Sequence, residues 1–289
     1  MIWLILSVAG YCLQNVGNKD FNRRHPAGMG GTLLQTALSL TTTALIAGLA
    51  GGAGSQTPEL MGLSAAFALM YALTIVLLCA ALSVGPVGPT SMLCSMGLLL
   101  PIVYGVLRYG ETLSWADATG MAAMMLCAWL LSQGRERGKK ARFRWMALAL
   151  GSATANGFLT LIKKNMSWNH PQADTRVFVF WGFVMAALLV WSAVAFLKLR
   201  GKDLSPWTDR RIILSAGCAG TGTAIGTLLQ MVSLALLPTV IVYAIALSSI
   251  PLILYLLSIF VYKELSVTPA GITALLLFLT GAVLFNVPV

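Results

Sequence analysis

The sequence predicts an all-α integral membrane protein with ten transmembrane helices, arranged as two inverted five-helix repeats. Three observations lead to this fold class. Hydrophobic residues make up 58% of the 289-residue chain and charged residues only 10%, long runs carry no charge, and the order of those runs repeats. A water-soluble domain has about 25% charged residues, so this balance is typical of a chain that lies in a bilayer.

The charged residues divide the chain into apolar runs of helix length. A run of about 20 apolar residues can cross the hydrocarbon core as one helix. Two runs are longer and must each hold two helices, broken over residues 85–89 and near Pro238. The expected helices occupy residues 1–18, 28–50, the two parts of 60–107, 117–133, 145–162, 177–197, the two parts of 212–262, and 265–287.

Each half of the chain shows the same order of two single runs, one double run and a final single run. Residues 19–26 and 164–171, which follow the first and sixth helices, both begin with Lys and end with His-Pro. Residues 111–114 and 264–266, which follow the fourth and ninth helices, both begin with Glu and end with Leu-Ser. Five helices is an odd number, so the second half enters the membrane in the opposite sense. Such inverted repeats are common among secondary transporters.

The chain therefore divides into a first repeat over residues 1–134, a basic linker over 135–144 and a second repeat over 145–289. Fifteen of the nineteen Lys and Arg residues lie in the loops on the side of the linker. The positive-inside rule places that side in the cytoplasm and both termini outside. We expect a multi-pass protein of the plasma or inner membrane whose partners are the lipid bilayer and a small-molecule solute, with a homodimer left open. The net charge of +10 is accounted for by these loops, so no nucleic-acid partner is expected.

The cysteines do not form a recognisable metal or redox motif. All five lie within apolar runs, none belongs to a C-x-x-C pair, and no Cys/His cluster has metal-ligand spacing. We interpret them as packing residues and expect no metal and no cofactor.

Duplicated short motifs resemble the drug/metabolite transporter superfamily, of the ten-helix EamA type. In that family an aromatic residue precedes a helix-1 lysine by eight positions, as Tyr11 precedes Lys19, and Asn156 precedes Lys164 in the same way. The family's Gly/Lys-Glu followed by Leu-Ser is similar to residues 110–114 and 263–266. The resemblance implies secondary transport of a small organic metabolite, with helices 1–4 and 6–9 around a central cavity and helices 5 and 10 outside it. Many members keep both termini in the cytoplasm, the opposite of the charge count.

Neutral polar and aromatic side chains are the candidate binding residues, because no ionisable residue lies near the middle of an expected helix. A mid-membrane carboxylate that alternates between proton and substrate has no candidate here, so we expect uniport or exchange. Asn15 and Asn18 lie near one face of the first helix, and Asn156 and Thr160 share a face of the sixth. Amides of this kind also bond across helix interfaces, and that alternative stays open.

The resemblance adds candidates from the other cavity helices, and Trp181 with the tyrosines would suit a cationic solute through cation–π contact. The full set of candidate substrate-binding residues is Tyr11, Asn15, Asn18, Tyr71, Ser95, Tyr104, Asn156, Thr160, Trp181, Gln230, Tyr243, Ser248 and Ser249.

The glycines of the expected eighth helix can be interpreted in two ways. Gly217, Gly222 and Gly226 allow close helix packing, or they allow the helix to slide during transport. On the second reading, Gly222→Leu abolishes transport and spares insertion.

Two other function classes compete with a transporter of an amino acid, amine or similar solute. One is an accessory or scaffold subunit that carries nothing. The other is a membrane enzyme acting on lipids, which needs paired carboxylates or a metal set. The acidic residues are scattered singly, so we do not expect an enzyme.

Overall fold

The computed structural model describes residues 1–24, 29–100, 104, 114–133, 139–170, 172–201, 210–236, 239–264 and 269–284. These residues form helices joined by short connections, and none of them lies in a strand. Large apolar side chains such as Leu188, which is 64% exposed, face outward from the helices, as they do where lipid covers a protein. Five helical stretches are long and apolar enough to cross a membrane, namely Gly30–Gly52, Pro58–Val84, Phe143–Met166, Thr175–Leu199 and Arg210–Ser233. The predicted all-helical membrane class is confirmed.

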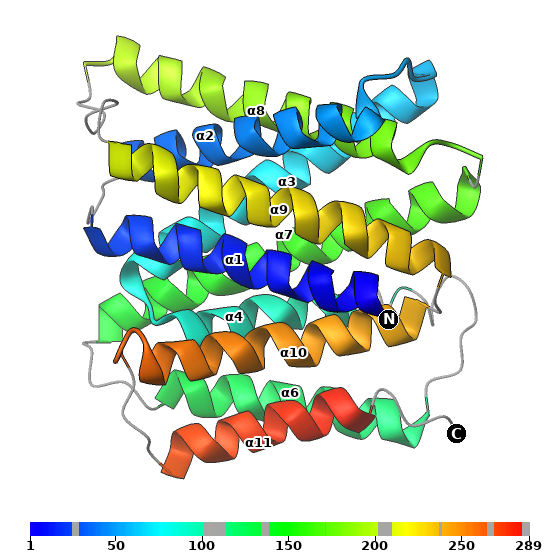
Figure 1. Ribbon diagram of the computed structural model, residues 1–289. Helices are drawn as coiled ribbons and strands as arrows, with labels where there is room; N and C mark the ends of the chain where they lie inside the picture. The colour runs from blue at the N-terminus through cyan, green and yellow to red at the C-terminus, as the bar shows by residue number, and fades with distance from the viewer. Residues whose placement is uncertain are drawn as a thin grey trace.

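Figure 1 shows the order of the helices along the chain. A π-helical turn, Gly48–Gly52, continues α2, and a 3₁₀ turn, Met96–Leu98, continues α4. The helices are α1 (Ile2–Arg24), α2 (Met29–Ala47), α3 (Pro58–Val84), α4 (Val87–Ser95), α6 (Trp115–Gln133), α7 (Lys139–Asn169), α8 (Thr175–Leu199), α9 (Arg210–Leu236), α10 (Thr239–Phe260) and α11 (Pro269–Leu284).

The predicted break in the first long run is confirmed. Helix α3 ends at Val84 and α4 begins at Val87, because Gly85 adopts an extended backbone and Pro86 precedes the first turn of α4. In the second long run, α9 ends at Leu236 and α10 begins at Thr239. Pro238, the predicted breaking residue, lies outside the described residues.

Two helices extend well past the ends that the charge pattern predicted. Helix α1 continues to Arg24 and not only to residue 18, and α7 covers Lys139–Asn169 and not only 145–162. Charged side chains end an apolar run, but Lys, Arg and Asn do not interrupt backbone hydrogen bonding as Pro does. Helix α1 therefore carries Lys19 into the bundle, and α7 carries Lys163.

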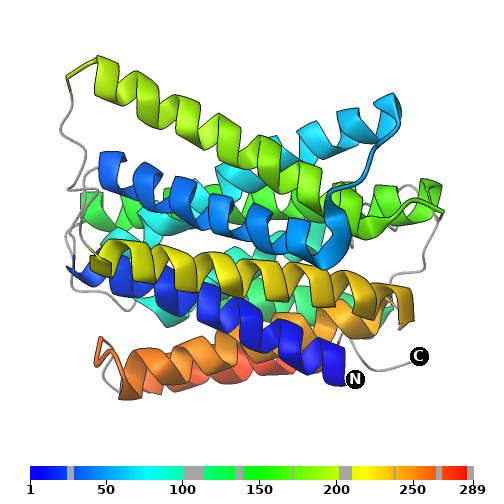
Figure 2. The same cartoon turned by 45° about the horizontal axis from the view of Figure 1, so that its top comes forward.

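The helices pack as pairs that stack into layers. Helix α2 packs on α8 at one side of the bundle and α6 packs on α11 at the opposite side, with α1 against α9, α3 against α7 and α4 against α10 between them. Figure 2 shows the same order, with α8 at one edge of the bundle and α10 and α11 at the opposite edge. The bundle interior is thus formed mainly by α1, α3, α4, α7, α9 and α10.

Glycines bring the backbones of α1 and α9 into direct contact. A Cβ atom added to Gly222 would lie 2.5 Å from the backbone nitrogen of Gln14, and one added to Gly10 would lie 2.6 Å from that of Gly226. The Ser7 hydroxyl donates to the carbonyl of Gly226 at 2.7 Å. Of the two readings of these glycines, close packing is directly observed at Gly222 and Gly226.

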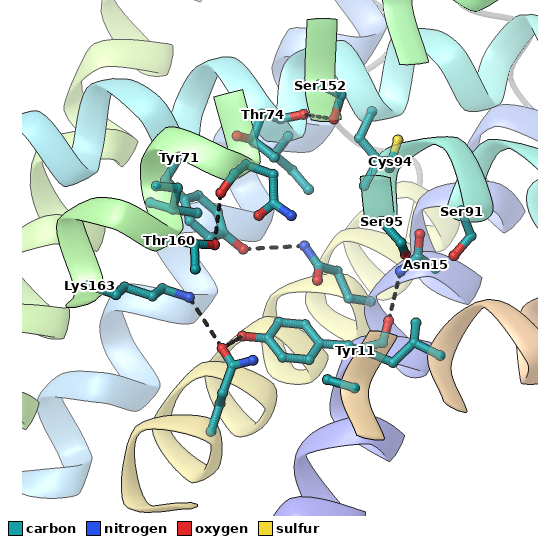
Figure 3. A pocket seen from close by; sticks show the side chains of 18 residues that line it. Tyr11, Asn15, Tyr71, Thr74, Ser91, Cys94, Ser95, Ser152, Thr160 and Lys163 are labelled. Carbon is teal, nitrogen blue, oxygen red and sulfur yellow. Dashed lines mark hydrogen bonds between the residues drawn. The ribbon is translucent and has the colours of Figure 1, made fainter. Parts of the chain in front are cut away.

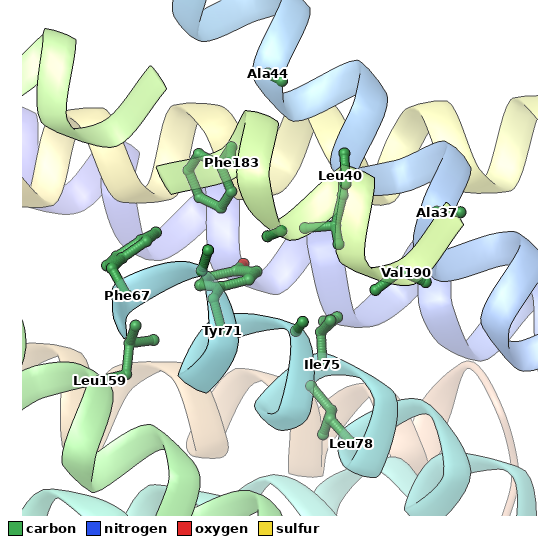
Figure 4. Close-up of a cluster of buried hydrophobic side chains, with 14 of the residues drawn as sticks. Ala37, Leu40, Ala44, Phe67, Tyr71, Ile75, Leu78, Leu159, Phe183 and Val190 are labelled. Atoms are coloured by element: carbon green, nitrogen blue, oxygen red, sulfur yellow. The ribbon is translucent and has the colours of Figure 1, made fainter. Parts of the chain in front are cut away.

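An aromatic cluster fills the core between α3 and α8 (Figure 4). The rings of Phe67, Phe178 and Phe183 meet edge to face, with Phe67 centroids 5.3 and 5.5 Å from the other two. Tyr71 packs on Phe183 with ring centroids 4.8 Å apart. This packing holds the Tyr71 ring in place, so its hydroxyl has a fixed position on the inner side of α3.

Candidate functional site

A cavity of about 150 Å³ lies inside the bundle (Figure 3). Helices α1, α3 and α4 contribute one part of its wall, and α7, α9 and α10 contribute the other. Most of the lining side chains are polar. The lining residues are Tyr11, Gln14, Asn15, Tyr71, Thr74, Ile75, Leu78, Ser91, Cys94, Ser95, Ser152, Asn156, Leu159, Thr160, Lys163, Gln230, Ala246 and Ile250.

One polar cluster joins three helices around the side-chain oxygen of Gln230. The Tyr11 hydroxyl donates to Gln230 Oε1 at 2.9 Å, and Lys163 Nζ donates to the same oxygen at 3.3 Å. The Tyr11 hydroxyl also lies 3.3 Å from Thr227 Oγ1. We call Tyr11, Lys163 and Gln230 the Lys163 cluster, and Figure 3 shows Tyr11 and Lys163 pointing toward the same point.

A second contact joins the cavity to the aromatic core. Gln14 Nε2 donates to the Tyr71 hydroxyl at 3.2 Å. Because the Tyr71 ring is packed against Phe183, Gln14 is oriented by a rigid partner and not by a mobile side chain.

The remaining polar groups of the wall are neutral, and several of them donate a proton to a helix carbonyl. Thr160 donates to Asn156 O at 2.9 Å, Ser152 donates to Thr74 O at 3.0 Å, and the Asn15 amide donates to Tyr11 O at 2.9 Å. Each side-chain oxygen keeps acceptor capacity after its own proton or amide is used. This part of the wall suits a neutral polar partner.

The charge of the cavity comes from Lys163. Its side chain is buried, with 6% exposure, and no carboxylate occurs among the residues that line the cavity in the described part of the chain. The sequence predicted no ionisable residue near the middle of a helix. Lys163 lies one residue past the predicted end of its helix and reaches the cavity because α7 continues to Asn169.

Seven of the thirteen sequence candidates line the cavity, and they come from five helices. They are Tyr11, Asn15, Tyr71, Ser95, Asn156, Thr160 and Gln230.

The other candidates lie elsewhere or are not described. Asn18 accepts a hydrogen bond from Gln35 Nε2 at 2.7 Å between α1 and α2, and Trp181 donates to Gly54 O at 2.8 Å. Tyr104 is 39% exposed, Ser249 is half-buried, and neither lines the cavity. The side chains of Tyr243 and Ser248 lie outside the described residues.

The second helix of each half does not reach the cavity wall. No residue of α2 or α8 occurs among the described lining residues, although the family resemblance implied a contribution from both. The two helices pack on each other instead, and this explains why Trp181 on α8 points to the loop carbonyl of Gly54.

The sequence reasoning missed Lys163 and Gln14. Asn156, Thr160 and Lys163 are spaced by four and three residues, which is the spacing of one helix face, so periodicity could have found Lys163. Cys94, interpreted as a packing residue, also reaches the cavity and contacts Ala149 O at 3.6 Å. Within the described ranges, no group of three His, Cys, Asp or Glu side chains could hold a metal ion.

A buried ion pair joins the helices beyond one end of the cavity. Lys19 Nζ lies 2.5 Å from Glu264 Oε1 and donates to the carbonyls of Leu82 and Gly85 at 3.3 and 3.1 Å. Glu264 Oε2 accepts from the backbone N–H of Val87 at 3.2 Å. The lysine thus meets the carbonyl end of α3 and the glutamate meets the N–H end of α4, which are the favourable ends for each charge. We call this set the Lys19–Glu264 cluster.

The chain turns sharply to bring Glu264 to Lys19. After α10 the backbone passes through Lys263 with a φ of 51°, and Glu264 N donates to Ser258 O at 3.0 Å. This turn lets Glu264 pair with Lys19, on the other half of the chain.

Comparison with known proteins identifies the fold and no family. No protein-family model matches the chain, and no curated protein sequence matches it. One crystal structure of another protein superposes on 99% of this chain and 98% of its own length, with a TM-score of 0.65 and 18% sequence identity. The two proteins therefore share a fold over nearly their whole lengths.

Proposed function

We propose that the protein is a secondary transporter that moves a small organic solute by alternating access. The observation that carries this proposal is the central polar cavity, whose wall is drawn from α1, α3 and α4 in one half and from α7, α9 and α10 in the other. Solute sites of transporters with inverted repeats lie at the interface of the two repeats.

We propose two inverted five-helix repeats and ten spans, and the helix pairing supports a twofold relation between the two halves. In a twofold arrangement, exchanging α1, α2, α3, α4 and α6 with α7, α8, α9, α10 and α11 must return the same contacts. The pair α1·α9 then becomes α7·α3, α2·α9 becomes α8·α3, and α1·α10 becomes α7·α4. All of these pairs are in contact, and α2·α8, α4·α10 and α6·α11 exchange with themselves.

The repeated sequence motifs point the same way. Lys19 near the end of α1 has its counterpart in Lys164 near the end of α7, and Tyr11 and Asn156 occupy matching places in the cavity wall. We assign the chain to the drug/metabolite transporter superfamily on these motifs, with repeats over residues 1–134 and 145–289. The basic linker, 135–144, is proposed to lie in the cytoplasm of a cell bounded by this plasma or inner membrane.

The Lys19–Glu264 cluster suggests which contact must change during transport. It joins α1, the α3–α4 turn and the end of α10 at one end of the cavity. A solute can leave by that end only if these elements separate. We propose that the cluster closes this end in the conformation seen here and breaks in the alternate one.

The charges of the cavity favour uniport or exchange. No carboxylate that could carry protons occurs among the described lining residues. A scaffold subunit does not need an internal cavity lined by polar groups and a lysine. A lipid-acting enzyme that used a metal ion would need a group of metal-ligating side chains, and the described residues hold no group of three His, Cys, Asp or Glu side chains suited to one.

Cysteine accessibility tests alternating access without knowledge of the solute. The five native cysteines are replaced by Ala and Ser95→Cys is introduced at the cavity wall. Inside-out and right-side-out vesicles are then treated with a membrane-impermeant methanethiosulfonate reagent. A transporter exposes the cavity to each side in turn, so labelling is expected in both vesicle types.

Leu188→Cys in the same cysteine-free background is the control, because this α8 side chain faces outward at 64% exposure where lipid excludes the reagent. It should stay unlabelled in both preparations. Labelling of residue 95 from one side alone, or from neither, would contradict alternating access and favour the scaffold class.

A further inference from the structure

We propose that the cavity binds a small organic monoanion whose carboxylate pairs with Lys163 and whose other end is neutral. This inference rests on the proposed transport function, because it names the solute class of the same cavity. It replaces the cationic solute that the tyrosines and Trp181 suggested from the sequence.

Lys163 has no opposite charge beside it among the described lining residues. Its side chain is 6% exposed and its hydrogen-bond partner is the neutral Gln230 oxygen at 3.3 Å. A charge inside a membrane is expensive unless it is paired, and a buried cation normally faces an anion. No carboxylate occurs among the described lining residues beside Lys163, so a bound anionic solute would supply the opposite charge.

Hydrogen-bond donors lie beside the Lys163 ammonium. Lysine carries three donors, and one of them is directed to Gln230. The Gln230 amide nitrogen carries two further donors in the same cluster, whereas the Tyr11 hydroxyl gives its proton to Gln230 Oε1. A carboxylate has two oxygens that accept such donors, and charge-assisted hydrogen bonds are roughly twice as strong as neutral ones.

The rest of the described cavity wall carries no charged side chain. Ser91, Ser95, Ser152 and Asn15 are neutral, and Ile75 and Leu159 are apolar. An ammonium group would find hydroxyl and amide oxygens there and no opposite charge in the described lining. A hydroxyl, carbonyl or methyl group fits this wall without leaving a second charge unpaired.

The volume of the cavity limits the size of the solute. The cavity has a volume of about 150 Å³, and a cavity of roughly that volume in another protein holds one benzene molecule. A three-carbon hydroxy acid is of this size, whereas a nucleoside or a disaccharide is not.

Four isosteric probes separate charge from shape: lactate is the anion, lactamide the neutral amide, alanine the zwitterion and alaninamide the cation. Dissociation constants are obtained for the purified full-length protein from thermal unfolding, since a ligand that binds the folded state raises its stability in proportion to ln(1 + [L]/Kd). Lactate should bind roughly tenfold or more tightly than lactamide, with alanine weaker than lactate and alaninamide weakest.

The Lys163→Met variant should bind lactate and lactamide equally, and Lys163→Arg should keep part of the preference for lactate. Lys198→Met, at the exposed end of α8, removes the same charge away from the cavity and should keep the wild-type order. Equal or tighter binding of any other probe by the wild type, no binding of lactate, or an unchanged lactate preference in Lys163→Met would each overturn the anion inference.

These outcomes are distinct from the accessibility test at residue 95. Labelling from both sides together with no preference for lactate would mean a transporter of another solute class. Labelling from one side together with a strong preference for lactate would mean a binding protein and not a transporter.

Discussion

The ammonium of Lys19 lies 2.5 Å from the carboxylate of Glu264, and this contact joins the first helix to the residue that follows the end of α10. The two residues are 245 positions apart in the sequence, so the contact holds the two halves of the chain together. Lys19 is buried, whereas a quarter of the Glu264 side chain is exposed. The pair is therefore neither a surface ion pair nor a fully desolvated one.

Removing one partner of this pair should destabilise the protein. Lys19→Met leaves Glu264 without its counter-ion, and the cost should be about 2 kcal/mol, between the value for an exposed pair and that for a buried one. Thermal unfolding of the purified protein, followed by tryptophan fluorescence, measures the change in Tm. Asp174→Asn is the control, because Asp174 pairs with Arg176 at the surface, where the two side chains are 42% and 59% exposed, and its Tm should change little.

Exchanging the two charges should not restore stability. In Lys19→Glu/Glu264→Lys the new glutamate would face the carbonyls of Leu82 and Gly85, and the new lysine would face the N–H of Val87. Both contacts would be repulsive, since each charge would meet the wrong end of a helix dipole. Recovery of the wild-type Tm in the exchanged protein would show that only the ion pair matters.

The same pair should also control access to the cavity. With Lys19→Met added to the cysteine-free Ser95→Cys protein, the end of the cavity closed by the Lys19–Glu264 cluster should open more often. Labelling of residue 95 from that side should then become several-fold faster, while labelling from the other side slows. Equal acceleration from both sides would indicate general loosening and would argue against a gate.

Gly222 should tolerate no side chain, whereas Gly217 on the same helix should tolerate one. A Cβ at Gly222 would lie 2.5 Å from Gln14 N and 2.6 Å from Gly10 O, and a Cβ at Gly217 would meet nothing within 4 Å. Gly222→Ala should therefore cost about 1–3 kcal/mol through overpacking, and Gly217→Ala should be neutral or slightly stabilising. The yield of folded protein and its Tm measure both effects.

This result would revise the sequence-based expectation for Gly222→Leu. That expectation was loss of transport with normal insertion, on the view that the helix slides. Backbone contact between α1 and α9 at this position predicts a lower folded yield as well. A Gly222→Leu protein with wild-type yield and Tm would restore the sliding interpretation.

The sequence predicted the helices well where their ends have a local chemical cause. The break between α3 and α4 follows from Pro86, which has no backbone N–H to donate and disfavours a helical conformation of Gly85 before it. The ends of α1 and α7 were placed too early, because Lys19 and Lys163 end an apolar run without ending a helix. Whether a lysine lies inside a bundle depends on the helices around it, and a single sequence does not contain that information.

The candidate site was predictable where the two proposed repeats point to matching sequence positions. Tyr11 and Asn156, and Asn15 and Thr160, occupy matching places and all four line the cavity. Trp181 was a candidate because the resemblance placed its helix at the cavity, yet α8 packs on α2 and Trp181 donates to Gly54 O, so a helix's place in depth or order is no guide to its lining residues. The side of a helix that faces a cavity is set by its packing partner, so depth alone was not sufficient.

Asn15 and Asn18 provide a matched test of this distinction, because they are three residues apart on the same helix. Asn15 lines the cavity, and Asn18 accepts a hydrogen bond from Gln35, which is fully buried. Asn15→Leu should abolish the binding of lactate by the purified protein and leave Tm without ligand nearly unchanged. Asn18→Leu should leave lactate affinity unchanged and lower stability by about 1 kcal/mol, because Gln35 loses its partner.

The double variant Asn18→Leu/Gln35→Leu makes the second half of this test stringent. Replacing both polar partners by apolar groups of similar shape is nearly neutral, since no buried group is left unpaired. Its Tm should therefore return toward the wild-type value, and its lactate affinity should stay normal. If Asn18→Leu instead weakened lactate binding as strongly as Asn15→Leu, the cavity used by the solute would have to extend to the α1–α2 interface.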